Sequence, residues 1–509
     1  MKGRMVRIAI VAAAAAGVFC VLAACVFPVA WSPDSKRVIF SVPPLGDDHV
    51  PVSIARLVMT DLEGRPLRDV AQVEPPSEEL SPAAWSPDGR WIAYFKFVHA
   101  VPGGEEKPES LEDAETIAVS LMLQEAESGE EKSIFEATVP WKDDELWKYN
   151  MFLGPQWAGH SKGLLVDAMP GEEPGLLMVD LEGKTLGTMP LAEADSRGTA
   201  ALSPDGRMLV YVQNIALQEE GVGVYVRDLG SGTARQVGQM PSHAKPAARL
   251  GWSSDSRTLY VPWDVETEGT RKCGLQRIDV KSGGGREMWG KQDAELCWLS
   301  HSAQTGRLAV QYRFPETGRV GIDVLEPGSE EVVPIAHGES WFGPAISPDG
   351  QWVAFGGQTG YEEDFLGVIA SADGARLSFF VPDEARRDEL VGRFCSMRFE
   401  AALAAADAYG PIEQAGPTEG ALRAAGEALD RVAKEHPAPI FQEAVAWGRV
   451  VLYVNAIRRA DPERAKELAA EARRQLEAYR DAYPESPLAA HLEKELEAAL
   501  GAGDEQRSP

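Results

Sequence analysis

The sequence is poor in basic residues, and this shortage excludes whole classes of partner. Fifty Lys and Arg residues stand against 78 Asp and Glu residues, so the formal net charge is −28 and the isoelectric point is near 4.8. Binding to nucleic acid needs a basic surface that neutralises phosphates. Adhesion to anionic headgroups needs Lys and Arg close to the membrane. We therefore expect neither a nucleic-acid partner nor electrostatic adhesion to lipid.

Cysteine is scarce too, with five residues in a chain of 509. Two of them fall in the first 25 residues, which leaves Cys273, Cys297 and Cys395. This odd number and its spacing match neither a zinc site nor a disulfide framework. The pattern favours buried free thiols, with a Cys273–Cys297 disulfide as the alternative.

The common signatures of catalytic and cofactor sites are missing. The chain has no H-E-x-x-H, no C-x-x-C, no G-x-S-x-G and no Gly-rich loop with the spacing of a phosphate cradle. The acids and histidine of segment 46–49 supply too few ligands for a divalent cation from one short loop. We therefore predict no catalytic residue, no cofactor and no metal site, and expect a protein that is not an enzyme.

The N-terminus has the pattern of a targeting segment. Three basic residues within positions 2–7 precede an apolar, Ala-rich stretch that ends in Leu22-Ala23-Ala24-Cys25. This ending resembles the lipobox of bacterial lipoproteins, which implies a signal peptide over 1–25 and lipidation at Cys25. An uncleaved membrane helix is the alternative, since 8–30 carries no charge and is long enough to span a bilayer, and simple secretion is another. All three predict export, and the first two anchor the chain in the bacterial cell envelope, facing the periplasm or the outside.

One phrase recurs along the rest of the chain. Residues 84–95 read AWSPDGRWIAYF, in which Pro and Asp favour a type I turn that Gly closes. Counted at the turn position, strong or weak copies stand at 34, 88, 160, 205, 255, about 304 and 349. Repetition at such a period is typical of propellers and solenoids.

Each repeat continues in the same order. A strand of apolar residues follows the turn, a third strand ends in an acid and a Gly turn, and a fourth strand completes the repeat. Four antiparallel strands repeated radially make a β-propeller blade. The sequence therefore predicts a mainly β fold over 28–383, a seven-bladed β-propeller of four-stranded antiparallel blades, with the Trp before each turn packed between blades.

The aspartates of the repeated turns resemble catalytic acids, but Asp in such a turn usually binds its own backbone. We interpret them as structural turn residues. They are Asp34, Asp88, Asp205, Asp255 and Asp349.

The repeated phrase resembles the WD40-like propeller repeat of the TolB type, found in periplasmic TolB-like proteins and in propellers attached to peptidases. The resemblance covers about residues 28–383 and implies the propeller fold. The chain departs from TolB because no α/β domain precedes the propeller and helices follow it. It departs from the propeller peptidases because no hydrolase motif follows the blades.

From residue 384 the apolar spacing becomes helical. Helices are expected over about 384–409, closed by Gly410-Pro411, and then over 418–436, 440–459, 461–483 and 488–500. The run EAYRDAYPESPLAAHLEKEL resembles the helix–turn–helix of a tetratricopeptide-like repeat, and a plain helical cap is the alternative. We expect a small all-α domain over 384–503 and a disordered tail over 504–509.

The loops between blades, and those between the second and third strands, are long in the sequence and would share one face of the propeller. Binding residues are concentrated on such loops. In segment 139–154, the aromatic residues Trp141, Trp147 and Tyr149 stand among charged residues. This combination suits contact with a protein or a glycan. Trp263 and Asp264, in the expected loop 262–272, form a second candidate. The alternative is that these aromatics only pack their loops down.

These observations favour a non-enzymatic envelope lipoprotein whose propeller and helical tail act as a protein–protein interaction scaffold, with partners that the sequence does not identify. A ligand- or glycan-binding sensor on the long-loop face is the alternative, followed by a propeller hydrolase or lyase.

Overall fold

The computed structural model describes most of the chain after residue 28. The described residues are 29–44, 54–75, 77–100, 116–140, 154–158, 161–167, 175–190, 200–213, 221–248, 250–267, 269–329, 332–339, 341–358, 365–406, 408–436, 439–484 and 486–505. Contacts divide the chain into two compact units. The first comprises 1–332, 340–372 and 378–380, and the second comprises 333–339, 373–377 and 381–509.

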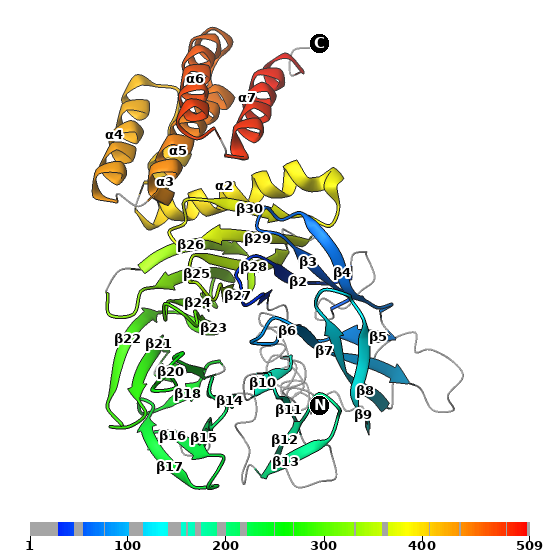
Figure 1. Cartoon of the computed structure of the whole chain (residues 1–509). Helices are drawn as coiled ribbons and strands as arrows, with labels where there is room; N and C mark the ends of the chain where they lie inside the picture. Colours follow the sequence, from blue (N-terminus) through cyan, green and yellow to red (C-terminus); the bar gives the residue numbers. More distant parts are fainter. Residues whose placement is uncertain are drawn as a thin grey trace, which may run out of the picture. The chain divides into compact units, whose positions relative to one another are not determined.

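Seven antiparallel sheets follow one another along the chain, and Figure 1 shows them set around a common axis. We number these blades in chain order. Blade one holds β1 (Ala30–Trp31), β2 (Val38–Val42), β3 (Arg56–Thr60) and β4 (Pro66–Gln72). Blade two holds β5 (Glu78–Leu80), β6 (Ala84–Trp85), β7 (Trp91–Ala100), β8 (Thr116–Glu125) and β9 (Glu131–Pro140). Blade three holds β10 (Gln156–Ala158), β11 (Gly163–Asp167), β12 (Gly175–Val179) and β13 (Thr185–Pro190). Blade four holds β14 (Ala201–Leu202), β15 (Met208–Gln213), β16 (Gly223–Asp228) and β17 (Ala234–Gln239).

The last three blades have the same strand order. Blade five holds β18 (Ala244–Pro246), β19 (Gly251–Trp252), β20 (Thr258–Thr267), β21 (Thr270–Asp279) and β22 (Gly285–Gln292). Blade six holds β23 (Glu295–His301), β24 (Leu308–Arg313), β25 (Arg319–Leu325) and β26 (Val332–Glu339). Blade seven holds β27 (Trp341–Ile346), β28 (Trp352–Gln358), β29 (Phe365–Ser371) and β30 (Leu377–Phe380).

The predicted seven-bladed propeller of four-stranded blades is therefore confirmed, with one refinement. In blades two and five the first strand is in two pieces, because β5 and β6 both pair with β7, and β18 and β19 both pair with β20. Pro82 lies between β5 and β6 and has no N–H to donate to a ladder, which accounts for the first of these breaks.

Burial along the strands follows from their place in a blade. The second and third strands pair with a strand along each edge, and neighbouring blades cover both of their faces. Strands β2 and β29 are therefore buried at every position. Outer strands are mostly exposed, as in β17, where only Val237 is buried. The core of the first unit thus lies between the blades.

Blade seven closes directly on blade one. The indole Nε1 of Trp31 donates to the carbonyl of Ala345 at 2.8 Å, and the N–H of Asp349 donates to Ser35 Oγ at 3.2 Å. The same two bonds join blades two and three, from Trp157 to Ala84 O and from Asp88 to Ser161, and blades four and five, from Trp252 to Ala201 O and from Asp205 to Ser256. The ring of blades is therefore closed by the same two kinds of hydrogen bond that join two of its internal junctions.

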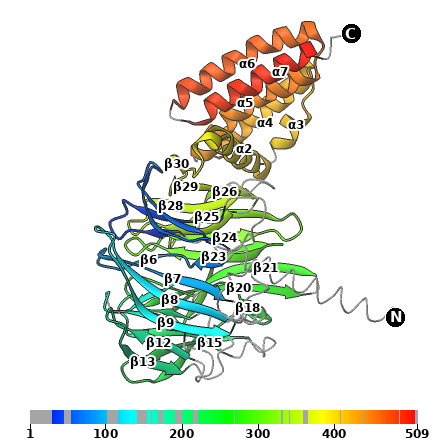
Figure 2. The same ribbon diagram turned by 90° about the vertical axis from the view of Figure 1, so that its right-hand side faces the viewer.

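The second unit is mainly helical, as predicted for the C-terminal region, and also contains residues 333–339 of β26 and segment 373–377. A short 3₁₀ turn, η6 (Glu384–Arg386), precedes α2 (Arg387–Ala405), α3 (Tyr409–Gln414), α4 (Glu419–Glu435), α5 (Pro439–Arg459), α6 (Pro462–Ala482) and α7 (Leu488–Glu505). Helix α5 packs against each of the other α-helices, and Figure 2 shows α5, α6 and α7 side by side. The sequence does not predict helix α3, because Gly410-Pro411 is typical of a helix stop. Pro411 instead lies in the first turn, where its missing N–H costs nothing.

Arg398 links helix α2 by hydrogen bonds to other segments of the second unit. Its side chain is fully buried on α2, where Nε donates to Ile335 O at 2.7 Å and Nη2 donates to Gly374 O at 2.8 Å. Burial lowers the pKa of this guanidinium. The arginine thereby ties α2 to two separate segments of its own unit.

No helix among the residues that the structure describes has the length and apolar character needed to cross a membrane.

Candidate functional site

Several predicted site residues lie outside the described part of the chain. These are the lipidation candidate Cys25 and the loop aromatics Trp141, Trp147 and Tyr149. The second pair of candidates, Trp263 and Asp264, is described.

The expected loop 262–272 is wrong, because β20 and β21 continue through it as a long hairpin. Their pairing runs without interruption from Thr258↔Asp279 to Thr267↔Thr270. Pro262 suggested a loop, but the apolar alternation of Val261, Trp263 and Val265 continues past it, and the strand tolerates the proline.

Trp263 is a packing residue in this hairpin. Its side chain is 2% exposed and its indole lies across Gly274, where a Cβ atom would stand 2.3 Å from the ring. The ammonium of Lys272 lies 5.3 Å from the ring centroid, within cation–π range. The residue therefore offers no surface for a partner.

Asp264 joins blade five to blade six. Its Oδ1 accepts the backbone N–H of Leu296 at 2.9 Å, and the residue is only 9% exposed. Burial raises its pKa to about 7, assisted by the charge of Glu295, while the hydrogen bond from Leu296 and the charges of Lys245 and Arg271 act in the opposite direction. It is thus a buried carboxyl poised near neutral pH.

The groups around Asp264 are mostly engaged with one another. Glu295 receives Arg271 Nη1 at 2.5 Å and Arg313 Nη2 at 2.8 Å. Cys273 is the register partner of Asp264, and burial together with the charge of Asp264 raises the pKa of its thiol to about 12. This cluster can hold or exchange a proton at Asp264, whereas its thiol is not activated as a nucleophile.

The turn aspartates bind their own turns. In each of the five, a serine two residues earlier donates to the carboxylate, and its Oγ accepts the N–H of the residue five positions after that serine. The serines are Ser32, Ser86, Ser203, Ser253 and Ser347. At Asp255 the bond from Ser253, followed by the N–H of Arg257, holds the pKa of the carboxyl below its ordinary value.

Cys273, Cys297 and Cys395 are buried free thiols, so the alternative of a Cys273–Cys297 disulfide is wrong.

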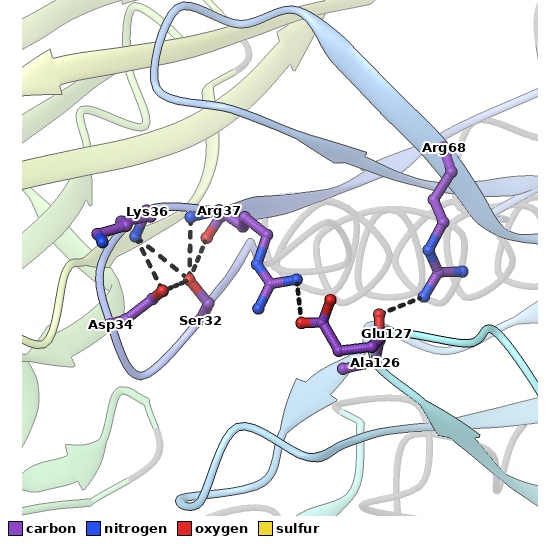
Figure 3. A network of polar contacts seen from close by, with 7 residues as sticks. All are labelled: Ser32, Asp34, Lys36, Arg37, Arg68, Ala126 and Glu127. Carbon is purple, nitrogen blue, oxygen red and sulfur yellow. Dashed lines mark hydrogen bonds and ion pairs between the residues drawn. The ribbon is translucent and has the colours of Figure 1, made fainter.

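The junction of blades one and two differs from the three junctions described above. Among the described residues the indole N–H of Trp85 has no hydrogen-bond partner, and the guanidinium of Arg37 lies 4.9 Å from its ring centroid. Figure 3 shows Arg37 reaching Glu127 at 3.0 Å and Arg68 donating to Ala126 O at 3.1 Å. Long basic side chains therefore bridge this junction, which lacks, among the described residues, the indole hydrogen bond of the three junctions described above.

A cavity of about 360 Å³ lies at the same junction. Its apolar lining comprises Val70, Ala71, Val73, Leu80 and Met122. Its polar lining comprises Asp69, Gln72, Tyr94, Lys96, Gln124 and Glu131. Two of the polar side chains are held by hydrogen bonds. Gln124 donates to Val70 O at 2.8 Å and accepts from Arg68 at 2.7 Å. Tyr94 donates to Glu131 at 2.7 Å.

Sequence reasoning missed this cavity, although a signal was present. Tyr94 and Lys96 alternate on β7, and Tyr94 lies opposite Met122 while Gln124 lies opposite Glu131. Polar side chains thus occupy the face of blade two that packs on blade one. A polar series at period two within otherwise apolar strands is the feature that would have indicated it.

Comparisons with known proteins find the propeller in several solved structures. The chain is 14% identical to hydrazine synthase of Kuenenia stuttgartiensis, covering 70% of this chain and 96% of that one with a TM-score of 0.41. It is 15% identical to the periplasmic gluconolactonase PpgL of Pseudomonas aeruginosa (67% and 94% covered, TM-score 0.41). It is 13% identical to TolB of Acinetobacter baumannii (60% and 80% covered, TM-score 0.36). With TM-scores below 0.5, these similarities carry no weight for the function of this chain.

No protein-family model matches the chain, and no curated protein matches it significantly.

Proposed function

We propose that this protein is a non-enzymatic binding scaffold of the bacterial cell envelope, whose propeller and helical unit present surfaces to a partner protein. The observation that carries the proposal is that the described side chains most like catalytic groups are committed to the architecture. The five turn carboxylates are bonded within their turns, and burial keeps the thiols of Cys273 and Cys395 protonated by raising their pKa.

The helical unit suits the same role. Helices α5, α6 and α7 pack on one another, which is compatible with the prediction of a tetratricopeptide-like repeat in this region. The outer face of α6 is polar, with ion pairs such as Arg464–Glu467 between successive turns. A helical unit with a charged exterior supports recognition of a partner rather than chemistry.

A second candidate function is a ligand- or glycan-binding sensor on the propeller. The specific observation in its favour is Asp264, a carboxyl with a pKa of about 7 at the junction of blades five and six. Perturbed carboxyls of this kind are concentrated at functional sites. A ligand that stabilises one protonation state of Asp264 would shift its titration, which NMR of the carboxyl can detect.

The location that we propose rests on the N-terminal sequence, with export and a lipid at Cys25. Metabolic labelling with a radioactive fatty acid tests it. The wild-type chain should incorporate label and a Cys25→Ala variant should not. Equal labelling of both chains, or of neither, contradicts lipidation at this residue.

The scaffold proposal is tested by chemical cross-linking of the tagged full chain in intact cells, followed by mass spectrometry, with an unrelated tagged exported protein as the control. We expect one or a few proteins to be recovered reproducibly. Failure to recover any above the control contradicts the proposal. So does turnover of glycoside, lactone or peptide substrates by the purified exported chain.

A further inference from the structure

The cavity between blades one and two holds a carboxylate that forms no ion pair with any described residue. Asp69 is paired with Arg56 at 2.8 Å and Lys96 with Glu78 at 3.1 Å. Glu131 accepts only the hydroxyl of Tyr94, and no ion pair reaches it from any described residue. Glu131 therefore contributes to the lining an exposed carboxylate that has no ion-pair partner among the described residues.

Gln72 and Gln124 are the other polar residues of the lining, and the rest of it is apolar. Val70, Val73 and Leu80 are buried, and Met122 is partly buried beside them. This apolar part suits an aliphatic stem, while the carboxylate of Glu131 suits a cation with N–H donors. Long basic side chains combine these two parts, because their methylene stems pack on apolar surface and their heads seek a charge partner.

We propose that this cavity receives a Lys or Arg side chain presented by the partner protein. The proposal rests on the scaffold function above and names the chemistry by which the partner is recognised. The volume of about 360 Å³ lies in the range of about 300–1,000 Å³ found for ligand pockets. It therefore admits a basic side chain together with part of its backbone.

Charge complementarity favours this occupant over an anion or a neutral chain. The protein carries a net charge of −28, so a basic segment is attracted from a distance as well as at the site. An anionic ligand would meet both Asp69 and Glu131, and the ammonium of Lys96 is already occupied by Glu78. A purely apolar side chain would leave the carboxylate of Glu131 without a charge partner.

The test uses the full exported chain with ¹³C-labelled methionine methyl groups, because Met122 reports directly on the cavity. N-acetyl-lysine methylamide is titrated as the probe, and N-acetyl-norleucine methylamide, which has a similar stem and no charge, is the matched ligand control. We expect the lysine compound to shift the Met122 methyl signal saturably, and the norleucine compound to shift it at least roughly tenfold less effectively.

Glu131→Gln removes the charge and keeps an acceptor for Tyr94. It should weaken lysine binding at least roughly tenfold. Glu130→Gln makes the same change one residue away, outside the cavity, and should leave binding unchanged. Unaltered methionine spectra of both free variants establish that they are folded.

Absence of a Met122 shift, equal shifts with both compounds, or binding that survives Glu131→Gln overturns the proposal. A partner recovered by cross-linking despite such a result would leave the scaffold function standing and remove only this site. Lysine binding without any recoverable partner would leave the site standing and contradict the scaffold function, because the site would then bind a free amine.

Discussion

At the scale of single residues, Asp264 is a buried carboxyl whose surroundings make stability depend on pH. Buried beside Leu296, it has a pKa of about 7 in the folded chain, against about 3.9 when unfolded. A carboxyl with a raised pKa favours folding only while it is protonated. The folded state therefore loses stability as the pH rises from about 4 to about 7.

Asp264→Asn removes this dependence and keeps an acceptor for the N–H of Leu296. We expect the variant and the wild type to have equal free energies of unfolding near pH 4. Between pH 4 and pH 7 the variant should become more stable than the wild type by about 1.4 kcal/mol per pH unit, and above pH 7 this difference should stay constant. Denaturant midpoints measured at several pH values give the difference in free energy of unfolding.

The exposed hairpin carboxyl of Asp279 is the control for this effect. The N–H and hydroxyl of Ser282 lower its pKa, so Asp279→Asn should give no growing advantage between pH 5 and pH 7. A difference for Asp264→Asn that does not change with pH, or one that favours the wild type at pH 8, contradicts the burial that we assign to Asp264.

Residue identity alone predicted the turns but not the surroundings of Asp264. The Ser–Asp bonds form within six residues of chain, so local sequence determines them. The burial of Asp264 depends on Leu296 in the next blade, and no local pattern contains that information. Pro262 added to the error, because a proline usually ends a strand.

At the scale of elements, the β20–β21 hairpin depends on a glycine under an indole. A Cβ at Gly274 would lie 2.3 Å from the Trp263 ring, so Gly274→Ala must displace that side chain. We expect a loss of about 1–3 kcal/mol in the free energy of unfolding. Gly187→Ala on β13, where a Cβ meets nothing within 4 Å, should change stability by less than about 0.5 kcal/mol. Equal effects of the two substitutions would contradict this packing.

Helix α2 depends in a similar way on Arg398. Arg398→Met leaves the buried carbonyls of Ile335 and Gly374 without their donors, at a cost of about 1–3 kcal/mol each. We expect faster hydrogen exchange of α2 amides, measured by mass spectrometry on the full chain. Arg423→Met, at a well-exposed position of α4, is the control and should leave exchange unchanged. Unchanged exchange in Arg398→Met would show that the two bonds do not hold α2.

The helices could be predicted closely from the sequence because their apolar spacing and their Asp or Pro boundaries are local features. Asp461 accepts the N–H groups of Glu463 and Arg464 at the start of α6, as such a boundary requires. Helix α3 escaped prediction because six residues show too little periodicity, and Gly410-Pro411 is also typical of a stop.

At the scale of the whole molecule, the seven blades form a closed ring. Trp31→Phe removes the bond to Ala345 O between blades seven and one, and Trp157→Phe removes the equivalent bond between blades three and two. If closure matches an internal junction, both substitutions should cost a similar amount, about 1–2 kcal/mol. Chemical denaturation provides the comparison. A neutral Trp31→Phe beside a costly Trp157→Phe would indicate an open ring.

The number of blades could be read from the sequence because every repeat carries its own turn. The cavity could not, because it forms where the outer strand of blade one meets the polar face of blade two. Its lining comes from β4, β5, β7, β8 and β9 together with Val73, and only the packing of two complete blades brings them into one place.

The most direct test of the central claim is photo-cross-linking in intact cells from a light-activated amino acid at Gln72, on the cavity wall, with the same group at exposed Leu186 on β13 as the control. We predict a covalent adduct with one defined protein from position 72, absent from position 186 and lost when Glu131→Lys is added. No adduct at position 72, or an adduct indifferent to Glu131→Lys, would contradict recognition of a partner at the junction of blades one and two.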